Sequence, residues 1–184
     1  LKKTNMEYYN EHTIIYLNGE FVKAAEAKAD FYSQSLHYGY AVFEGIRSYR
    51  DVNGETMIFK ELEHYERLKN SALAMNMPYP FITQELIEAT YTLLEPNYLQ
   101  DAYIRSVVYA PANMSFVQNP FSDIVSAVWE MAPFLGEKLL KVMTSSFQRP
   151  NPKGLQIKAK ASGHHVNSIL ARPDTTANEN EDTL

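Results

Sequence analysis

Two Asn-Gly dipeptides restrict the folds that are open to this chain, because each predicts a tight turn between antiparallel strands. Asn and Gly tolerate the positive φ angles that two-residue hairpin turns require. Residues 12–18 have strand character, and Asn18-Gly19 lies at the end of this segment, directly before residues 20–22. Asn53-Gly54 lies between residues 46–50 and residues 56–59. The first 60 residues therefore predict two β-hairpins.

The next part of the chain predicts two helices and two further strands. Residues 61–76 carry apolar side chains at helical spacing, and Pro78 and Pro80 end that helix. Thr83 is expected to cap a second helix that runs to about Leu94. Residues 102–110 and 124–131 have strand character. We therefore expect an α+β fold up to residue 132.

Residues 133–184 predict a linker and the beginning of a second unit. Residues 133–138 read as a linker, residues 139–147 as a strand, and residues 166–171 as a short helix whose extension Pro173 complicates. One or two strands and one helix are too few for an independent core. The expected organisation is an N-terminal domain over residues 1–132, a linker over 133–138, and an incomplete second domain over 139–184.

Composition removes several classes of function. The 184 residues include no cysteine, which excludes disulfides, thiolate metal sites and cysteine nucleophiles. A net charge of -5 without a basic tract gives no reason to expect nucleic acid. The apolar stretches are short and interrupted, so we expect no membrane span and a cytoplasmic location.

Taken alone, the candidate site segments each have an ordinary structural explanation. Residues 33–47 combine glycines and aromatics, which suit either a ligand site or a kinked strand. Arg67 could bind a phosphate, or simply pair with Glu63 on the same helix. Desolvation would make a lysine nucleophilic, yet these patterns do not choose between Lys158 and Lys160.

The strand at residues 102–110 and the adjacent histidines complete the candidate list. Alternation places Tyr103 and Arg105 on one face, where an arginine beside a tyrosine suits a carboxylate or an interface. His164 and His165 are weak evidence for a metal, because no carboxylate or cysteine stands at ligand spacing, and no metal is expected.

Read in order, these segments resemble the branched-chain amino acid aminotransferases, a family of fold-type IV pyridoxal-phosphate enzymes. The resemblance covers residues 12–184 and rests on several motifs at consistent spacing. They are Leu17-Asn-Gly-Glu-Phe21, His37-Tyr-Gly39, Val42-Phe-Glu-Gly-Ile-Arg47, His64-Tyr-Glu-Arg-Leu-Lys-Asn-Ser-Ala72, Ala102-Tyr-Ile-Arg105, Ala132-Pro-Phe-Leu-Gly136 and Lys158-Ala-Lys-Ala-Ser-Gly-His-His-Val-Asn-Ser-Ile-Leu170.

The resemblance implies a cofactor, a reaction and a set of site residues. Lys160 would bond to the aldehyde of pyridoxal 5'-phosphate and then move a proton. Arg67 would hold the phosphate. The reaction would transfer the amino group of leucine, isoleucine or valine to 2-oxoglutarate. The remaining roles are substrate contacts: Tyr103 and Arg105 would meet carboxylates, Phe43 would line the aliphatic pocket, and Tyr38 would reach the pocket of a neighbouring subunit in a homodimer or larger homo-oligomer.

The sequence departs from the family pattern at three places. His165 stands where a tyrosine that contacts the cofactor ring is common, so we expect His165 to make that contact. Phe134 replaces a frequent linker tyrosine at the substrate pocket. Leu184 comes before the family's acidic partner of the pyridine nitrogen and its phosphate-binding turns. The 184-residue chain alone is therefore expected to be inactive.

Two other interpretations remain open. A D-amino acid or amine transaminase, or an aminodeoxychorismate lyase, would share the fold, although His37-Tyr-Gly39 and Phe43-Glu-Gly-Ile-Arg47 favour the branched-chain type. A different class of explanation is a non-catalytic fragment that folds mainly through its N-terminal domain.

Overall fold

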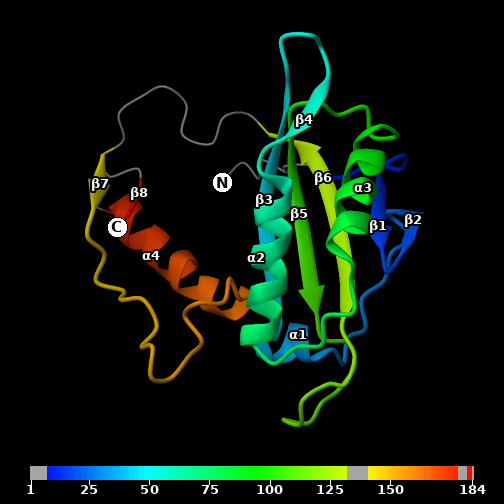
Figure 1. Cartoon of the computed structure of the whole chain (residues 1–184). Coiled ribbons are helices and arrows are strands. Elements are labelled where there is room, and N and C mark those ends of the chain that lie inside the picture. The colour runs from blue at the N-terminus through cyan, green and yellow to red at the C-terminus, as the bar shows by residue number, and fades with distance from the viewer. Residues whose placement is uncertain (1–7, 132–140, 178–181, 184) are drawn as a thin grey trace.

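A computed structural model describes residues 8–131, 141–177 and 182–183, and its main feature is a six-stranded antiparallel sheet (Figure 1). The strand order is β2-β1-β6-β5-β3-β4. The strands are β1 (Ile14–Leu17), β2 (Glu20–Lys23), β3 (Ala41–Arg50), β4 (Thr56–Ile58), β5 (Ala102–Tyr109) and β6 (Asp123–Glu130). Helices α2 (Glu61–Ala74) and α3 (Thr83–Leu94) cover one face of this sheet, so the predicted α+β fold class is confirmed.

Both predicted hairpins are present, but their turns are built differently. Asn18 and Gly19 have φ angles of 50° and 99°, as the sequence predicts for the turn between β1 and β2. In the second hairpin, only Gly54 of the Asn-Gly pair has a positive φ, of 88°. There a carboxylate oxygen of Asp51 accepts hydrogen bonds from the backbone N–H of Asn53 and of Glu55, both at 2.8 Å. This turn is therefore held by a side chain.

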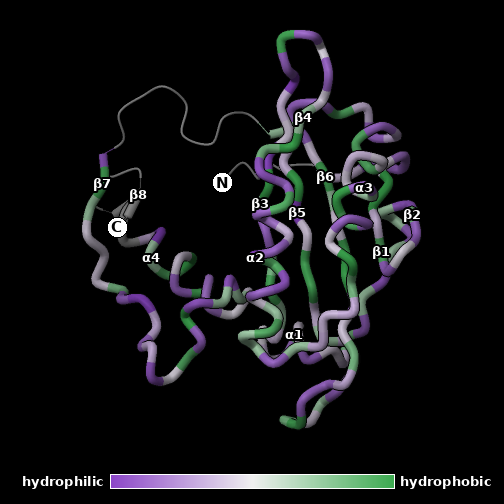
Figure 2. The backbone as a smooth tube through the Cα atoms, viewed as in Figure 1, coloured by the Kyte–Doolittle hydropathy of each residue, from purple (hydrophilic) through white to green (hydrophobic). Residues whose placement is uncertain are grey.

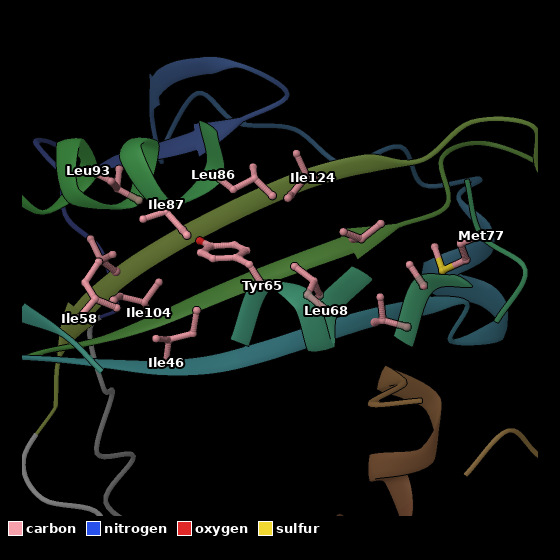
Figure 3. Packing of buried hydrophobic residues seen from close by; sticks show 14 of the residues in the cluster. Ile46, Ile58, Tyr65, Leu68, Met77, Leu86, Ile87, Leu93, Ile104 and Ile124 are labelled. Atoms are coloured by element: carbon pink, nitrogen blue, oxygen red, sulfur yellow. The ribbon is translucent and has the colours of Figure 1, made fainter. Parts of the chain in front are cut away.

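The helices that cover the sheet agree closely with the sequence-based expectation, apart from one cap. α2 (Glu61–Ala74) and α3 (Thr83–Leu94) form a shared core with the sheet around Tyr65 and Leu68 (Figure 3). The prediction that Thr83 caps α3 is wrong, because Ile82 occupies that position. The Thr83 hydroxyl instead donates to Glu66 on α2 at 2.8 Å, which ties the two helices together.

The strands of the sheet have one face in the core and one face that is only partly covered. On β5 the alternate residues Ala102, Ile104, Ser106 and Val108 are buried, and the residues between them are half-buried. Figure 2 shows the resulting concentration of apolar residues along the central strands. Tyr103 and Arg105 therefore share the partly covered face, as the alternation predicts.

A short polar row runs through the buried face. The Tyr65 hydroxyl lies 2.5 Å from the Thr90 hydroxyl and 3.0 Å from that of Ser106. Ser106 in turn lies 2.8 Å from the Ser126 hydroxyl on β6. All four side chains are buried, and hydrogen bonding to one another offsets the cost of removing their hydroxyls from water.

The C-terminal part has less regular structure than the sequence suggests. The prediction of one strand over residues 139–147 is wrong. Among the described residues of that segment, only Val142–Met143 form a strand, β7, which pairs in parallel with β8 (Asp182–Thr183). Two short neighbours offer too few ladder hydrogen bonds to extend the strand. The linker over residues 133–138 lies outside the described residues, and the domain boundaries stay a prediction.

One further helix, α4 (Val166–Ala177), is longer than the sequence predicts. It continues through Pro173, which removes one backbone donor without ending the helix. It follows a single 3-10 turn at Ser162–His165. α4 begins beside α2 and β3 and leads away from them (Figure 1). Within the described residues, none of these helices is long and apolar enough to cross a membrane.

Candidate functional site

β3 presents two candidate residues on opposite faces of the sheet. Phe43 and Glu44 are neighbours in a strand, so their side chains point in opposite directions. Phe43 lies on the partly covered face with Arg105, whereas Glu44 lies on the helix-covered face and has no exposed surface. An ionisable side chain at zero exposure needs hydrogen-bonding partners, and these come from α2.

The segment before α4 returns to β3 and places Lys160 at the edge of the sheet. Ala161 forms an isolated antiparallel bridge with Val42, and the Phe43 backbone N–H donates to the Lys160 carbonyl oxygen at 3.1 Å. The Lys160 backbone N–H donates to the Ser71 hydroxyl on α2 at 3.0 Å. Lys160 is thereby held between β3 and α2, whereas Lys158 is exposed.

The environment of the Lys160 amine favours its neutral form. Its Nζ lies 4.7 Å from the centre of the Phe43 ring. Burial is the main reason why the pKa of Lys160 is lowered from its ordinary value, and the cations of Arg67, Arg105 and Arg149 act in the same direction. The negative charge of Glu44 acts in the opposite direction but does not cancel the effect. A larger fraction of such a lysine is neutral near pH 7 than of a solvated one, and only the neutral amine can accept a proton or act as a nucleophile.

The Phe43 ring brings three cationic or ionisable side chains together. The guanidinium carbon of Arg105 lies 4.4 Å from the ring centre. The His165 ring centre lies 4.7 Å away at a steep interplanar angle of 65°. Phe43 therefore connects Lys160, Arg105 and His165, which come from segments that are far apart in the sequence.

Arg105 retains an unused donor that faces no described partner. Its Nη2 donates to the Tyr103 hydroxyl at 2.7 Å. Its Nε is buried and has no hydrogen-bond partner among the residues that the structure describes. A buried guanidinium donor of this kind suits an anionic ligand such as a carboxylate.

The position of Tyr103 depends on a glycine in the neighbouring strand. Gly45 pairs with Arg105 in the sheet, and a Cβ atom added to Gly45 would overlap the hydroxyl and ring of Tyr103. The Tyr103 ring also packs against Trp129 at a centroid distance of 4.9 Å. Gly45 thus provides the space in which Tyr103 reaches Arg105.

His165 is oriented by the backbone of its own turn. Its Nδ1 lies 2.9 Å from the carbonyl oxygen of Ala161, which assigns the ring proton to Nδ1. Burial is the main cause that lowers the pKa of His165 below its usual value. The ring is therefore neutral at pH 7, and its Nε2 is available as a hydrogen-bond acceptor.

Arg67 is paired, but not with Glu63 as the simple helix interpretation suggests. Its Nε and Nη2 donate to the two carboxylate oxygens of Glu44 at 2.5 and 2.7 Å. His64 Nδ1 adds a third bond to Glu44 at 2.9 Å. Sequence reasoning missed Glu44 and His64, although a glutamate within the otherwise apolar stretch of β3 was an available signal.

A cavity of about 430 Å³ lies between α2 and the Lys160 segment. This volume is sufficient for a small cofactor or substrate. Its lining is rich in cations and is formed by Arg67, Arg149, Pro150, Ile157, Lys158, Ala159, Lys160, His164 and His165. Such a lining favours an anionic ligand.

Three predicted site residues, Arg67, Lys160 and His165, line this cavity. Phe43 contacts Lys160 and His165, and it connects Arg105 and Tyr103 to them.

Tyr38 lies elsewhere. Tyr38 lies in α1 (Gln34–Tyr38), where its hydroxyl donates to the Met114 carbonyl oxygen at 3.0 Å and its ring packs against Phe116. It lines a different cavity. Phe134 lies outside the described residues.

Comparison with known proteins links this arrangement to one family. Residues 41–184 match the family model described as amino-transferase class IV. The chain is 37% identical over 164 residues to a branched-chain-amino-acid aminotransferase of Pseudomonas aeruginosa, and the match covers 86% of this chain and 53% of that protein. The chain thus spans about half the length of the curated relatives that it matches.

Solved structures of similar proteins show the same fold. A branched-chain aminotransferase from Thermoproteus uzoniensis with norvaline superposes with a TM-score of 0.87 at 30% identity, over 93% of this chain and 58% of that one. A branched-chain amino acid aminotransferase from Thermobaculum terrenum, solved in its PLP-form, gives a TM-score of 0.83 at 28% identity, over 95% and 59% of the two chains.

Proposed function

The chain belongs to the amino-transferase class IV family, and we propose that the complete protein exchanges amino groups between branched-chain L-amino acids and 2-oxoglutarate or glutamate. The observation that carries this proposal is the Lys160 amine, which is half-buried against Phe43 with a lowered pKa beside a cation-lined cavity. Relatives that are named branched-chain-amino-acid aminotransferases supply the substrate class.

The cavity residues fit pyridoxal 5'-phosphate, the proposed cofactor. A phosphate ester requires cationic donors, and the cavity is lined by Arg67 and Arg149. An aldehyde requires an amine that is partly neutral at physiological pH, and Lys160 has a lowered pKa. We assign Arg67 to the phosphate and Lys160 to the aldehyde carbon. His165 is assigned to the ring, because a proton on Nδ1 leaves Nε2 as a hydrogen-bond acceptor that no donor among the described residues occupies.

Each assigned residue has a defined task in the proposed reaction. When bound, the cofactor supplies an electron sink for the electrons that remain after the substrate α-carbon loses its proton. Lys160 Nζ accepts that proton and returns it, for which an amine with a lowered pKa is suited. Phe43 shields the amine from water on one side.

The partly covered face of the sheet is the proposed substrate side. Arg105, with its unpartnered Nε among the described residues, is assigned to the side-chain carboxylate of glutamate, and Tyr103 supports it through the 2.7 Å hydrogen bond. Phe43 is assigned to the aliphatic side chain of leucine, isoleucine or valine. Phe134 and Tyr38 keep their predicted substrate roles, Tyr38 in the pocket of a second subunit.

A side-by-side assay of three substrates tests the proposal. The complete protein with added pyridoxal 5'-phosphate is given leucine, D-alanine or aminodeoxychorismate, with 2-oxoglutarate as the amino acceptor for the two amino acids. We expect glutamate formation with leucine at a rate well above that with D-alanine. Preference for D-alanine or aminodeoxychorismate would assign one of the sibling activities, and no turnover with any substrate would contradict the proposal.

The proposed assembly is a homodimer or a larger homo-oligomer in the cytoplasm. Its support is an exposed apolar surface around α1 and the loop after β5, which includes Phe31, Leu36, Tyr38, Phe116 and Val117. Figure 2 shows the apolar tip of that loop. Surfaces of this kind commonly bury against a partner. Sedimentation of the complete protein at micromolar concentration tests this, and an active monomer would contradict it.

A further inference from the structure

Glu44 is the only carboxylate among the described residues that joins α2 to β3 by ion pairing. Both of its oxygens accept hydrogen bonds from Arg67, and one also accepts from His64. The Glu44 side chain has no exposed surface, whereas that of Arg67 is 57% exposed. The contact therefore anchors a largely solvent-accessible guanidinium to a rigid, buried acceptor.

We propose that Glu44 is a positioning residue, which orients the Arg67 guanidinium so that its remaining N–H groups bind the phosphate of the cofactor. This inference rests on the proposed function, because it assumes an anionic cofactor in the cavity that Arg67 and Lys160 line.

The donor arrangement of Arg67 supports this role. A guanidinium is planar, so two hydrogen bonds to one carboxylate fix both its position and the plane in which it lies. Nε and Nη2 are used for this purpose, which leaves Nη1 for a second anion. Without Glu44, a long side chain with more than half its surface exposed has many alternative rotamers.

The third partner keeps the carboxylate itself in place. To donate to Glu44, His64 carries a proton on Nδ1, and its ring is attached to the same helix as Arg67, one turn earlier. Burial acts to raise the pKa of Glu44, but the bonds from Arg67 and His64 outweigh it and lower the pKa. Glu44 is therefore ionised at neutral pH and remains a strong acceptor.

Stability alone is a weak explanation for such a pair. Burying a charged pair often contributes little net stability relative to apolar residues of similar size. Glu44 stands in a row of β3 side chains whose neighbours Val42 and Ile46 are fully buried and apolar. The Glu44 carboxylate instead forms an ion pair with Arg67, the α2 residue that lines the cavity.

A comparison of two probes tests the positioning role. Pyridoxal 5'-phosphate and pyridoxal share the aldehyde and ring, but only the first carries a phosphate. Dissociation constants of both are measured by absorbance titration with the complete apoprotein and its Glu44→Gln variant. We expect the preference for the phosphorylated probe to fall by about tenfold or more in Glu44→Gln, with pyridoxal binding changed far less.

Two further variants make the result specific. Glu63→Gln is the matched control, because Glu63 lies on the same helix, is exposed and pairs only weakly with Lys60 at 3.8 Å. It should leave both dissociation constants unchanged. Arg67→Lys keeps the positive charge but cannot form the two parallel bonds, and adding Glu44→Gln to it should cause no further loss of phosphate preference.

The outcomes separate this inference from the proposed function. If the wild-type protein prefers the phosphorylated probe through Arg67, yet Glu44→Gln retains the full preference, the positioning role is refuted and the proposed function stands. If the wild-type protein binds neither probe, the proposed function fails. If Glu44→Gln does not fold, Arg67→Lys provides the test, because it changes an exposed side chain. An Arg67→Lys protein that prefers the phosphorylated probe as strongly as wild type would refute the positioning role of Glu44.

Discussion

The Lys160 amine lies 4.7 Å from the centre of the Phe43 ring, and the main chains of the same two residues are joined by a 3.1 Å hydrogen bond. The backbone contact therefore fixes the distance at which the ring shields the amine. This relationship makes Lys160 distinct from Lys158, which is exposed two residues earlier. It also supplies the most direct test of the proposed chemistry.

Replacing Lys160 should remove activity without unfolding the protein. In Lys160→Ala the backbone bonds to Phe43 and Ser71 remain, while the proton-transferring amine is lost. We expect transamination of leucine by the complete protein to fall by about 10²–10⁴-fold or more, with an unchanged circular dichroism spectrum. Lys158→Ala is the comparison: its exposed side chain lines the same cavity, so it should lose far less activity than Lys160→Ala. An active Lys160→Ala with an inactive Lys158→Ala would move the assignment to Lys158.

The lowered pKa of Lys160 should make a variant without the amine more stable at neutral pH. The pKa of Lys160 is lower in the folded protein than in the unfolded chain. Keeping the Lys160 amine charged therefore lowers the free energy of unfolding, in full at every pH below the folded-state pKa. This destabilisation disappears as the pH rises through the window that ends at the ordinary value of 10.5. Urea unfolding of Lys160→Met apoprotein should therefore show a gain over wild type at pH 7 that shrinks by pH 10. A gain that grows with pH would contradict this.

Substituting Gly45 should disturb the Tyr103 and Arg105 pair. A methyl group at Gly45 meets the Tyr103 side chain, which itself is packed against Trp129 and has little room to move. We expect Gly45→Ala to reduce the free energy of unfolding by about 1–3 kcal/mol. Gly154→Ala is the control, because its added Cβ would meet only a carbonyl oxygen at 3.7 Å. Equal stability of the two variants in urea titrations would refute the steric role of Gly45.

Removing the Tyr65 hydroxyl from the buried polar row should lower the free energy of unfolding. Tyr65→Phe leaves Thr90 and Ser106 with one hydrogen bond fewer inside the core. The expected loss is about 1–3 kcal/mol in the free energy of unfolding, measured by urea titration. Tyr98→Phe, at a residue that is 94% exposed, should change the same quantity by no more than about 0.5 kcal/mol. A Tyr65→Phe variant as stable as wild type would show that the row is dispensable.

Elements with local signals could be predicted from the amino-acid sequence. Asn18-Gly19 adopts the positive φ angles that its side chains tolerate, so its hairpin follows from a dipeptide. The alternation in β5 places Tyr103 and Arg105 on one face because the side-chain period of a strand is two. Helices α2 and α3 lie close to the predicted bounds, because their apolar residues recur at helical spacing.

The partners that these elements meet could be identified only from the folded chain. The family resemblance assigned Lys160, but the different burial of Lys160 and Lys158 depends on contacts such as the hydrogen bond from Lys160 to Ser71, 89 residues earlier in the sequence. Arg67 pairs with Glu44 on β3 rather than with Glu63 on its own helix, because β3 brings a fully buried carboxylate against that helix. Contacts between distant segments depend on the packing of whole elements, and a local pattern does not encode their geometry.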